Sequence, residues 1–106
     1  MELSVSDLVM STAGRDRGEL FYVIGTEGVY ALLANGKDRT LERPKRKKRK
    51  HLLRVEQNES EIVRKLKSGD QVLNAQLRKA LARERQTFGS QNQGGQKLGK
   101  RRRNRT

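Results

Sequence analysis

Residues 11–25 read S-T-A-G-R-D-R-G-E-L-F-Y-V-I-G, and this stretch decides the fold of the N-terminal half of the chain. Gly14 and Gly18 bracket a charged triplet, which predicts a tight turn with a positive φ at one or both glycines. Residues 7–12 before the turn are partly apolar, and residues 20–26 after it are rich in β-branched and aromatic side chains. We therefore expect two strands joined by a glycine-bracketed loop.

Short apolar segments and turns continue beyond this loop. Glu27-Gly28 predicts a turn, and residues 29–34 predict a third strand. Asn35-Gly36 is the strongest short hairpin signal in the chain, because both residue types tolerate the left-handed conformation of a type I′ turn. Residues 37–42 are expected to begin a short fourth strand.

Residues 44–51 read P-K-R-K-K-R-K-H, with six cations in succession. Pro44 lacks a backbone donor and cannot fill a central strand position, so we expect the run to lie along a sheet edge or in a loop. Residues 51–56 are then expected to form a closing strand, with Leu53 and Val55 facing inward. Strands this short, separated by glycine turns, predict a small closed or partly closed barrel.

The hydrophobic period changes to that of a helix after residue 57. Residues 58–61 read N-E-S-E, a pattern typical of a helix N-terminus, and this first helix is expected to end at Gly69. A second helix is expected after Asn74, with apolar residues at helical spacing. The expected organisation is a mainly β domain at residues 1–56, a helical extension of one or two short helices at residues 57–86, and a basic tail at residues 87–106 that is disordered until bound.

Composition narrows the class of protein. The chain has 106 residues, a formal net charge of +13 and no cysteine, so a disulfide and a thiolate metal site are both excluded. The positive charge lies in two blocks, a net of +8 over residues 37–54 and +6 over residues 87–106. An acidic start without an apolar core is unlike a signal peptide, and no apolar run suits a bilayer. These features indicate a soluble, cytoplasmic protein that contacts a polyanion twice or along one extended surface.

The order of these motifs resembles that of a known family. The glycine loop at residues 11–25, the strand that follows it, Asn35-Gly36 and the run at residues 44–51 together resemble the KOW module. The resemblance covers about residues 5–56 and is closest to the variant found in the L14e group of large-subunit ribosomal proteins and its bacterial KOW-domain RNA-binding relatives. It implies a small SH3-like β-barrel, binding to ribosomal RNA or action around ribosomes and transcription complexes, and a role for Gly18 as the glycine of the KOW loop.

Cations around the glycine loop and along the basic run are the candidate contacts with RNA. Glycine lets a phosphate approach the backbone, and an arginine fork bonds a phosphate bidentately. We expect Arg15 and Arg17 to splay outward while Asp16 turns back to hold the loop. The candidate RNA-binding residues are Gly14, Arg15, Arg17, Gly18, Lys37, Arg39, Arg43, Lys45, Arg46, Lys47, Lys48, Arg49, Lys50, His51, Lys97, Lys100, Arg101, Arg102, Arg103 and Arg105.

The expected partner is structured RNA, above all ribosomal RNA and the ribosome, with neighbouring ribosomal proteins as further partners. The chain has few aromatic residues, and some of them must fill the core, so recognition by shape and backbone is favoured over base identity. Two alternatives remain open, namely a KOW protein-interaction module in transcription or translation complexes and a general nucleic-acid-binding protein. Because no grouping of catalytic or metal-binding residues is evident, we expect no enzyme activity, no cofactor, no metal, no small-molecule substrate and no membrane contact.

Overall fold

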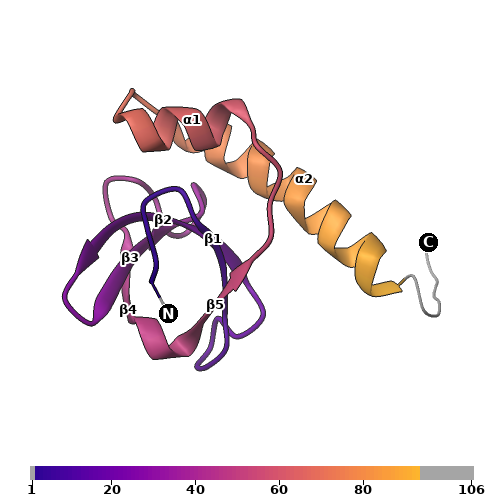
Figure 1. Ribbon diagram of the computed structural model, residues 1–106, viewed down its shortest axis with the longest axis horizontal. Helices are drawn as coiled ribbons and strands as arrows, with labels where there is room; N and C mark the ends of the chain where they lie inside the picture. The colour runs from indigo at the N-terminus through magenta and orange to yellow at the C-terminus, as the bar shows by residue number, and fades with distance from the viewer. Residues whose placement is uncertain (1, 94–106) are drawn as a thin grey trace.

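The computed structural model describes residues 2–93, which form five short strands and, after them, two α-helices (Figure 1). The predicted order of a β domain followed by helices is therefore confirmed. The elements are β1 (Leu8–Ser11), β2 (Leu20–Glu27), β3 (Tyr30–Ala34), β4 (Lys45–Lys48), the short 3₁₀ helix η1 (Arg49–His51), β5 (Leu52–Val55), α1 (Glu61–Ser68) and α2 (Asn74–Gln93).

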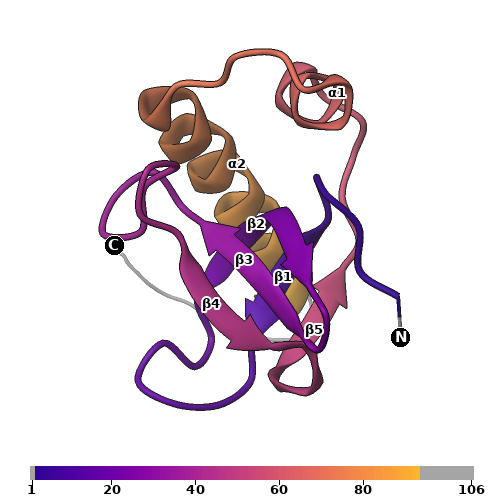
Figure 2. The same ribbon diagram turned by 90° about the vertical axis from the view of Figure 1, so that its left-hand side faces the viewer.

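The strands form a single antiparallel sheet in the order β4-β3-β2-β1-β5. The loop between β1 and β2 has a positive φ at both Gly14 and Gly18, which confirms the glycine-bracketed turn. Residues 45–48 of the basic run form β4, which pairs with β3 at one edge of the sheet (Figure 2). Of the two expected places, a sheet edge or a loop, this part of the run occupies the edge. The strand expected at residues 37–42 is absent, and these residues form the loop that leads into β4.

Both faces of the sheet are apolar, and each contributes to a separate core. Leu8 and Tyr22 face the helices, where Leu77 and Leu81 of α2 pack against them. The alternate residues of the same strands point to the other face and form the second core. That second core consists of Leu3, Val9, Phe21, Val23, Ala31, Leu33 and Leu52. β1, β3 and most of β2 therefore read as nearly continuous apolar runs, as strands do when both faces are covered.

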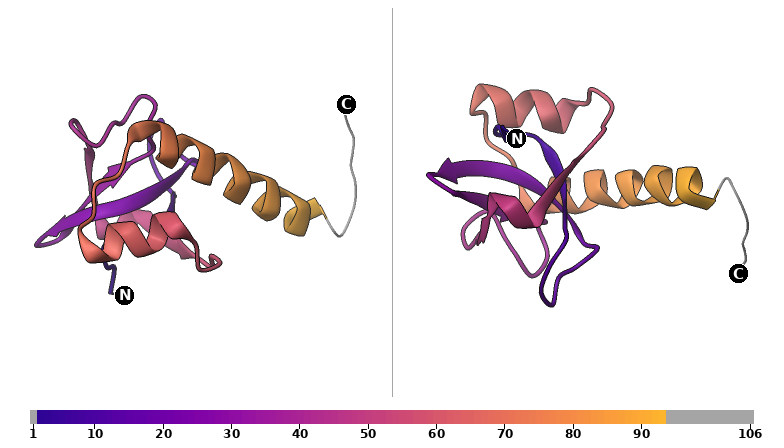
Figure 3. Two further views of the ribbon diagram at one scale, coloured as in Figure 1. Left: turned by 90° about the horizontal axis from the view of Figure 1, so that it is seen from above. Right: turned by 60° about the horizontal axis from the view of Figure 1, so that its bottom comes forward.

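The two helices lie over the β1–β2 side of the sheet, and α2 extends past its edge (Figure 3). Ser60 caps α1, because its hydroxyl accepts a hydrogen bond from the Val63 backbone at 3.3 Å, and Gly69 ends the helix with φ of 79°. Ile62 and Val63 are buried against the sheet. The predicted start and end of this first helix are confirmed.

Helix α2 continues to Gln93, beyond residue 86, where the sequence predicts the tail to begin. Thr87, Gly89, Ser90 and Asn92 have low helix propensity, so the added turns depend on propagation of the helix already formed by residues 74–86, which needs no new nucleation. No helix within residues 2–93 combines the length and the apolar character that crossing a bilayer requires.

The loop after β3 is not the expected type I′ hairpin. Asn35 does not have a positive φ, and its side chain instead accepts hydrogen bonds from the backbone of Lys37 at 2.9 Å and of Arg39 at 3.0 Å. Gly36 has φ of 79°, and a Cβ there would collide with the carbonyl oxygen of Asn74. The loop is therefore shaped by its contact with the start of α2, which a two-residue hairpin would not reach.

The inward-facing residue of β5 also differs from the expectation. Leu52 is buried, whereas Leu53 is 49% exposed, so the prediction that Leu53 faces inward is wrong. Val55, the other residue expected inside, is half-buried and packs against the core beneath the helices. Leu52 joins the second core because η1 turns the chain immediately before it and sets its pairing with Ser11.

Candidate nucleic-acid interface

Pairing with β3 divides the basic run between the two faces of the sheet. Lys45 and Lys47 lie opposite Leu33 and Ala31, whose side chains belong to the second core. The alternate cations therefore point to the opposite face, because side chains along a strand alternate. The four cations of β4 therefore form two pairs in different surroundings, Lys45 with Lys47 and Arg46 with Lys48.

The first pair is bound to a single carboxylate. Lys47 Nζ lies 3.0 Å from Asp16 Oδ1 and also donates to the Ala13 carbonyl at 2.8 Å, while Lys45 Nζ lies 3.3 Å from Asp16 Oδ2. The Ser11 hydroxyl donates to the same carboxylate at 2.6 Å. Only 11% of the Lys47 side chain and 26% of the Lys45 side chain is exposed. These two lysines therefore have a structural partner and little surface to offer RNA.

Asp16 is the buried anchor of this arrangement. Burial alone would raise its pKa, but the hydrogen bonds from Ser11 and Lys47 and the ammonium group of Lys45 outweigh burial and lower the pKa to about 2. The carboxylate turns back into the glycine loop, as the sequence predicts, and leaves Arg15 and Arg17 on the exposed side. The loop is thereby fastened to β4, although the two are far apart in the sequence.

A shallow hollow of about 330 Å³ lies where the glycine loop, the loop after β3 and β4 meet. Arg15 and Arg39 line it from the two loops, together with the carboxylates of Glu19 and Asp38. The hydrogen bond from the Asn35 amide lowers the pKa of Asp38, so this carboxylate is charged at neutral pH. The hollow therefore has mixed charge, which suits a polyanion less well than a purely basic surface would.

Arg46 is on the opposite face of β4 and has two partners. Its Nε lies 3.3 Å from Glu27 Oε1, and its guanidinium carbon lies 4.0 Å from the centre of the Tyr30 ring. More than half of its side chain, 59%, remains exposed. These partners were not predicted from the sequence, because they depend on the register that brings β2, β3 and β4 together.

The last cations of the run lie in η1 or directly before it. Lys48 and Lys50 are exposed, and together with Val29, Arg49 and Leu52 they line a second hollow. The backbone of Arg49 donates to the Val29 carbonyl at 2.8 Å, which holds the turn against the β2–β3 connection. Within residues 2–93 neither Lys48 nor Lys50 forms an ion pair. This end of the run therefore presents the most accessible charge.

The remaining candidates divide between the loop after β3 and parts of the chain outside the described residues. Lys37 and Arg43 are exposed, and the half-buried His51 contributes its carbonyl to Thr12. Arg78 was missed by sequence reasoning, and it donates to the Gly36 carbonyl at 2.6 Å from α2, so it adjoins this loop. Outside the described residues lie Lys97, Lys100, Arg101, Arg102, Arg103 and Arg105.

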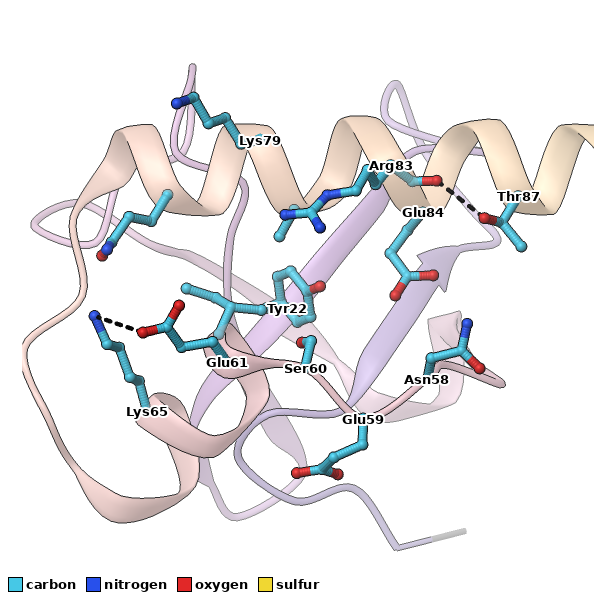
Figure 4. Close-up of a pocket in the computed structure, with 13 residues that line it drawn as sticks. Tyr22, Asn58, Glu59, Ser60, Glu61, Lys65, Lys79, Arg83, Glu84 and Thr87 are labelled. Carbon is cyan, nitrogen blue, oxygen red and sulfur yellow. Dashed lines mark hydrogen bonds and ion pairs between the residues drawn. The ribbon is translucent and has the colours of Figure 1, made fainter.

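A groove between the start of α1 and α2 is the other sizeable hollow, with Tyr22 at its floor (Figure 4). Burial, and then the charge of Glu84, raise the pKa of Tyr22 to about 12, and burial raises the pKa of Glu84. Glu59 and Glu61 line the opposite wall. Lys65, Lys79 and Arg83 also line the groove, so its charge is mixed, and the candidate interface is instead the strongly basic segment at β4, η1 and the adjoining loops.

Across residues 2–93, no group of three or more histidine, aspartate or glutamate side chains gathers as metal ligands would. Comparison with models of known protein families and with curated proteins finds no match for the chain.

Proposed function

We propose that this protein binds structured RNA and associates with the ribosome, through the edge of the sheet formed by β4 and η1 and through the loops beside it. The observation that carries the proposal is the uneven neutralisation of charge on this edge. Residues 37–54 have a net charge of +8, yet only Lys45, Arg46, Lys47 and Arg54 of this segment form ion pairs within the described part of the chain. The exposed cations that have no such partner are suited to bind an external polyanion.

The scaffold we propose is the SH3-like barrel of the KOW module. Its support is that β4 and β5, the two edge strands, are separated only by η1. On either side of that turn, the Thr12 backbone donates to the His51 carbonyl at 2.9 Å and Arg49 donates to Val29. The resemblance of residues 5–56 to the KOW module, which includes the basic run, also favours an RNA partner.

RNA would be held mainly by its phosphates in this arrangement. Arg15 and Arg17 project from a loop that Asp16 fastens. Lys48 is at the end of β4 and Lys50 is in η1, so all four cations reach the ligand from ordered backbone. Cations in fixed positions lose less conformational entropy on binding than cations on a free chain. Each phosphate contact releases condensed counterions, which makes the affinity strongly dependent on salt.

The salt dependence of binding tests this proposal. The full chain is titrated with a structured fragment of ribosomal RNA between about 50 and 200 mM salt, and with duplex DNA as a competitor. Six phosphate contacts would lower the affinity by about a thousandfold over this range. An affinity that barely changes would contradict the proposal, and equal competition by duplex DNA would indicate general nucleic-acid binding.

Sucrose-gradient fractionation of cell extracts tests the association with ribosomes. We expect the protein to migrate with ribosomal particles at low salt and to leave them as the salt concentration rises. A protein partner that stays bound after nuclease treatment and in high salt would favour a protein-interaction module instead.

A further inference from the structure

The outer face of β3 and β4 carries an arginine that lies over an aromatic ring, Arg46 over Tyr30. Tyr30 and Arg46 lie on this face, where Lys48 is the cross-strand partner of Tyr30. The helices cover the β1–β2 side of the sheet and leave this side open (Figure 3). Exposure of Arg46 and Lys48 on this face agrees with that arrangement.

From this face we propose that Arg46 is a stacking platform for one unpaired nucleobase of the bound RNA, an inference that rests on the proposed function. The Tyr30 ring supports one face of the guanidinium at 4.0 Å, and Glu27 fixes its edge at 3.3 Å. Two contacts of this kind hold a flexible side chain in one orientation before the ligand arrives. The other face of the plane is free to stack on a base, as arginine planes do with unstacked bases of RNA.

A phosphate is a poor ligand for this particular arginine. Bidentate binding of phosphate uses the edge of the guanidinium, and the Glu27 carboxylate already occupies part of that edge. The same carboxylate would repel a phosphate placed beside it. The neutral face of a nucleobase meets neither obstacle, so the chemistry favours a base over Arg46 itself.

Neighbouring cations suit the backbone on either side of that base. Lys48 and Lys50 are exposed and lie along the chain next to Arg46, and Val29, which is 64% exposed, lies beside them in the hollow at η1. The lysines would neutralise the flanking phosphates. The ligand is therefore a bulged or looped-out nucleotide in structured RNA, which adds a base contact to the recognition by shape that the sequence favours.

Three RNA hairpins test the proposal with the full chain at constant salt. One is fully paired, one carries a single-nucleotide bulge, and one carries the same bulge as an abasic site. We expect the protein to bind the bulged hairpin about tenfold more tightly than the other two, because stacking of one base supports a difference of this size. Arg46→Lys keeps the charge and removes the plane, so this variant should bind all three alike.

Arg64→Lys is the matched control, since Arg64 is an exposed arginine of α1, outside the proposed interface, and should be dispensable for the preference. Thermal melting of both variants establishes that they fold as the parent protein does. Equal binding of all three hairpins by the parent protein, tight binding of the abasic bulge, or a preference that survives Arg46→Lys would overturn the stacking platform and leave RNA binding intact. Failure to bind any hairpin would overturn the proposed function as well.

Discussion

Asp16 shows that one residue can determine the role of the cations around it. Within the sequence it stands between two arginines and reads as part of a surface turn. In the structure it is buried and accepts a hydrogen bond from Ser11 while neutralising Lys45 and Lys47. A carboxylate that joins a loop to a distant strand stabilises both, because removing it would leave two lysines close together without a counter-charge.

Acid should therefore weaken the fold through Asp16. Its pKa is lowered from 3.8 to about 2, so its contribution to stability is complete above pH 4 and is lost as the pH falls toward 2. The loss amounts to about 2 kcal/mol in the free energy of unfolding, which chemical denaturation at several pH values measures. Asp16→Asn should be less stable at neutral pH and should show a smaller loss between pH 4 and pH 2.

Asp70→Asn is the control for this measurement, because Asp70 is exposed and within residues 2–93 it forms no ion pair. Its unfolding free energy should stay within about 0.5 kcal/mol of the parent value. If Asp16→Asn lost as much stability in acid as the parent protein does, another carboxylate would be responsible.

In β4, residues of the same charge have different roles because they lie on different faces of the strand. Four consecutive cations form it, and their alternation sends Lys45 and Lys47 toward Asp16 while Arg46 and Lys48 remain on the outer face. A helix or an irregular loop would have distributed the same residues differently. The strand thus separates cations that support the fold from cations that are available to a ligand.

Two substitutions on β4 test this division of roles. Lys47→Met should lower the free energy of unfolding by about 1–3 kcal/mol, because it breaks partly buried hydrogen bonds to Asp16 and Ala13. Lys48→Met should leave stability within about 0.5 kcal/mol and weaken RNA binding instead. Denaturation and RNA titration of both variants provide the two measurements, and equal effects of the two variants on stability would contradict the assignment.

The whole molecule carries its positive charge in two places, the ordered edge at β4 and η1 and the segment after α2. The sequence predicts that this second segment becomes ordered only when it binds, and such ordering costs about 1–2 kcal/mol per residue for the backbone. The groove between α1 and α2 has both carboxylates and cations in its lining and adds no comparable basic surface. RNA contact is therefore expected to be dominated by the β4 edge.

Charge reversal and truncation can be compared directly. Lys48→Glu combined with Lys50→Glu should weaken binding of structured ribosomal RNA at physiological salt more than deletion of residues 94–106. The deletion removes six cations from the chain but none from the ordered edge. Lys67→Glu, on the exposed surface of α1, is the control for a reversed charge elsewhere. The opposite ranking would mean that the β domain serves only as a scaffold for the tail.

Local signals predicted most of the elements. The glycines at positions 14 and 18, the cap at Ser60 and the stop at Gly69 act through their own backbone conformation or their nearest neighbours, and the structure confirms each of them. The loop at residues 35–43 was predicted wrongly because its shape depends on Asn74, which donates to Glu42 and accepts from the Leu41 backbone. The local sequence pattern cannot predict such a long-range contact.

The sequence alone was enough to predict short apolar strands, a glycine loop, a basic run away from the centre of the sheet and both ends of the first helix, because each depends mainly on neighbouring residues. Tertiary structure alone decided which cations are accessible. The register between β3 and β4 set the alternation, and the return of the Asp16 loop supplied the counter-charge that removes Lys45 and Lys47 from the surface. Charge is a property of composition, whereas its availability to a ligand depends on which residues the fold brings within a few ångströms of it.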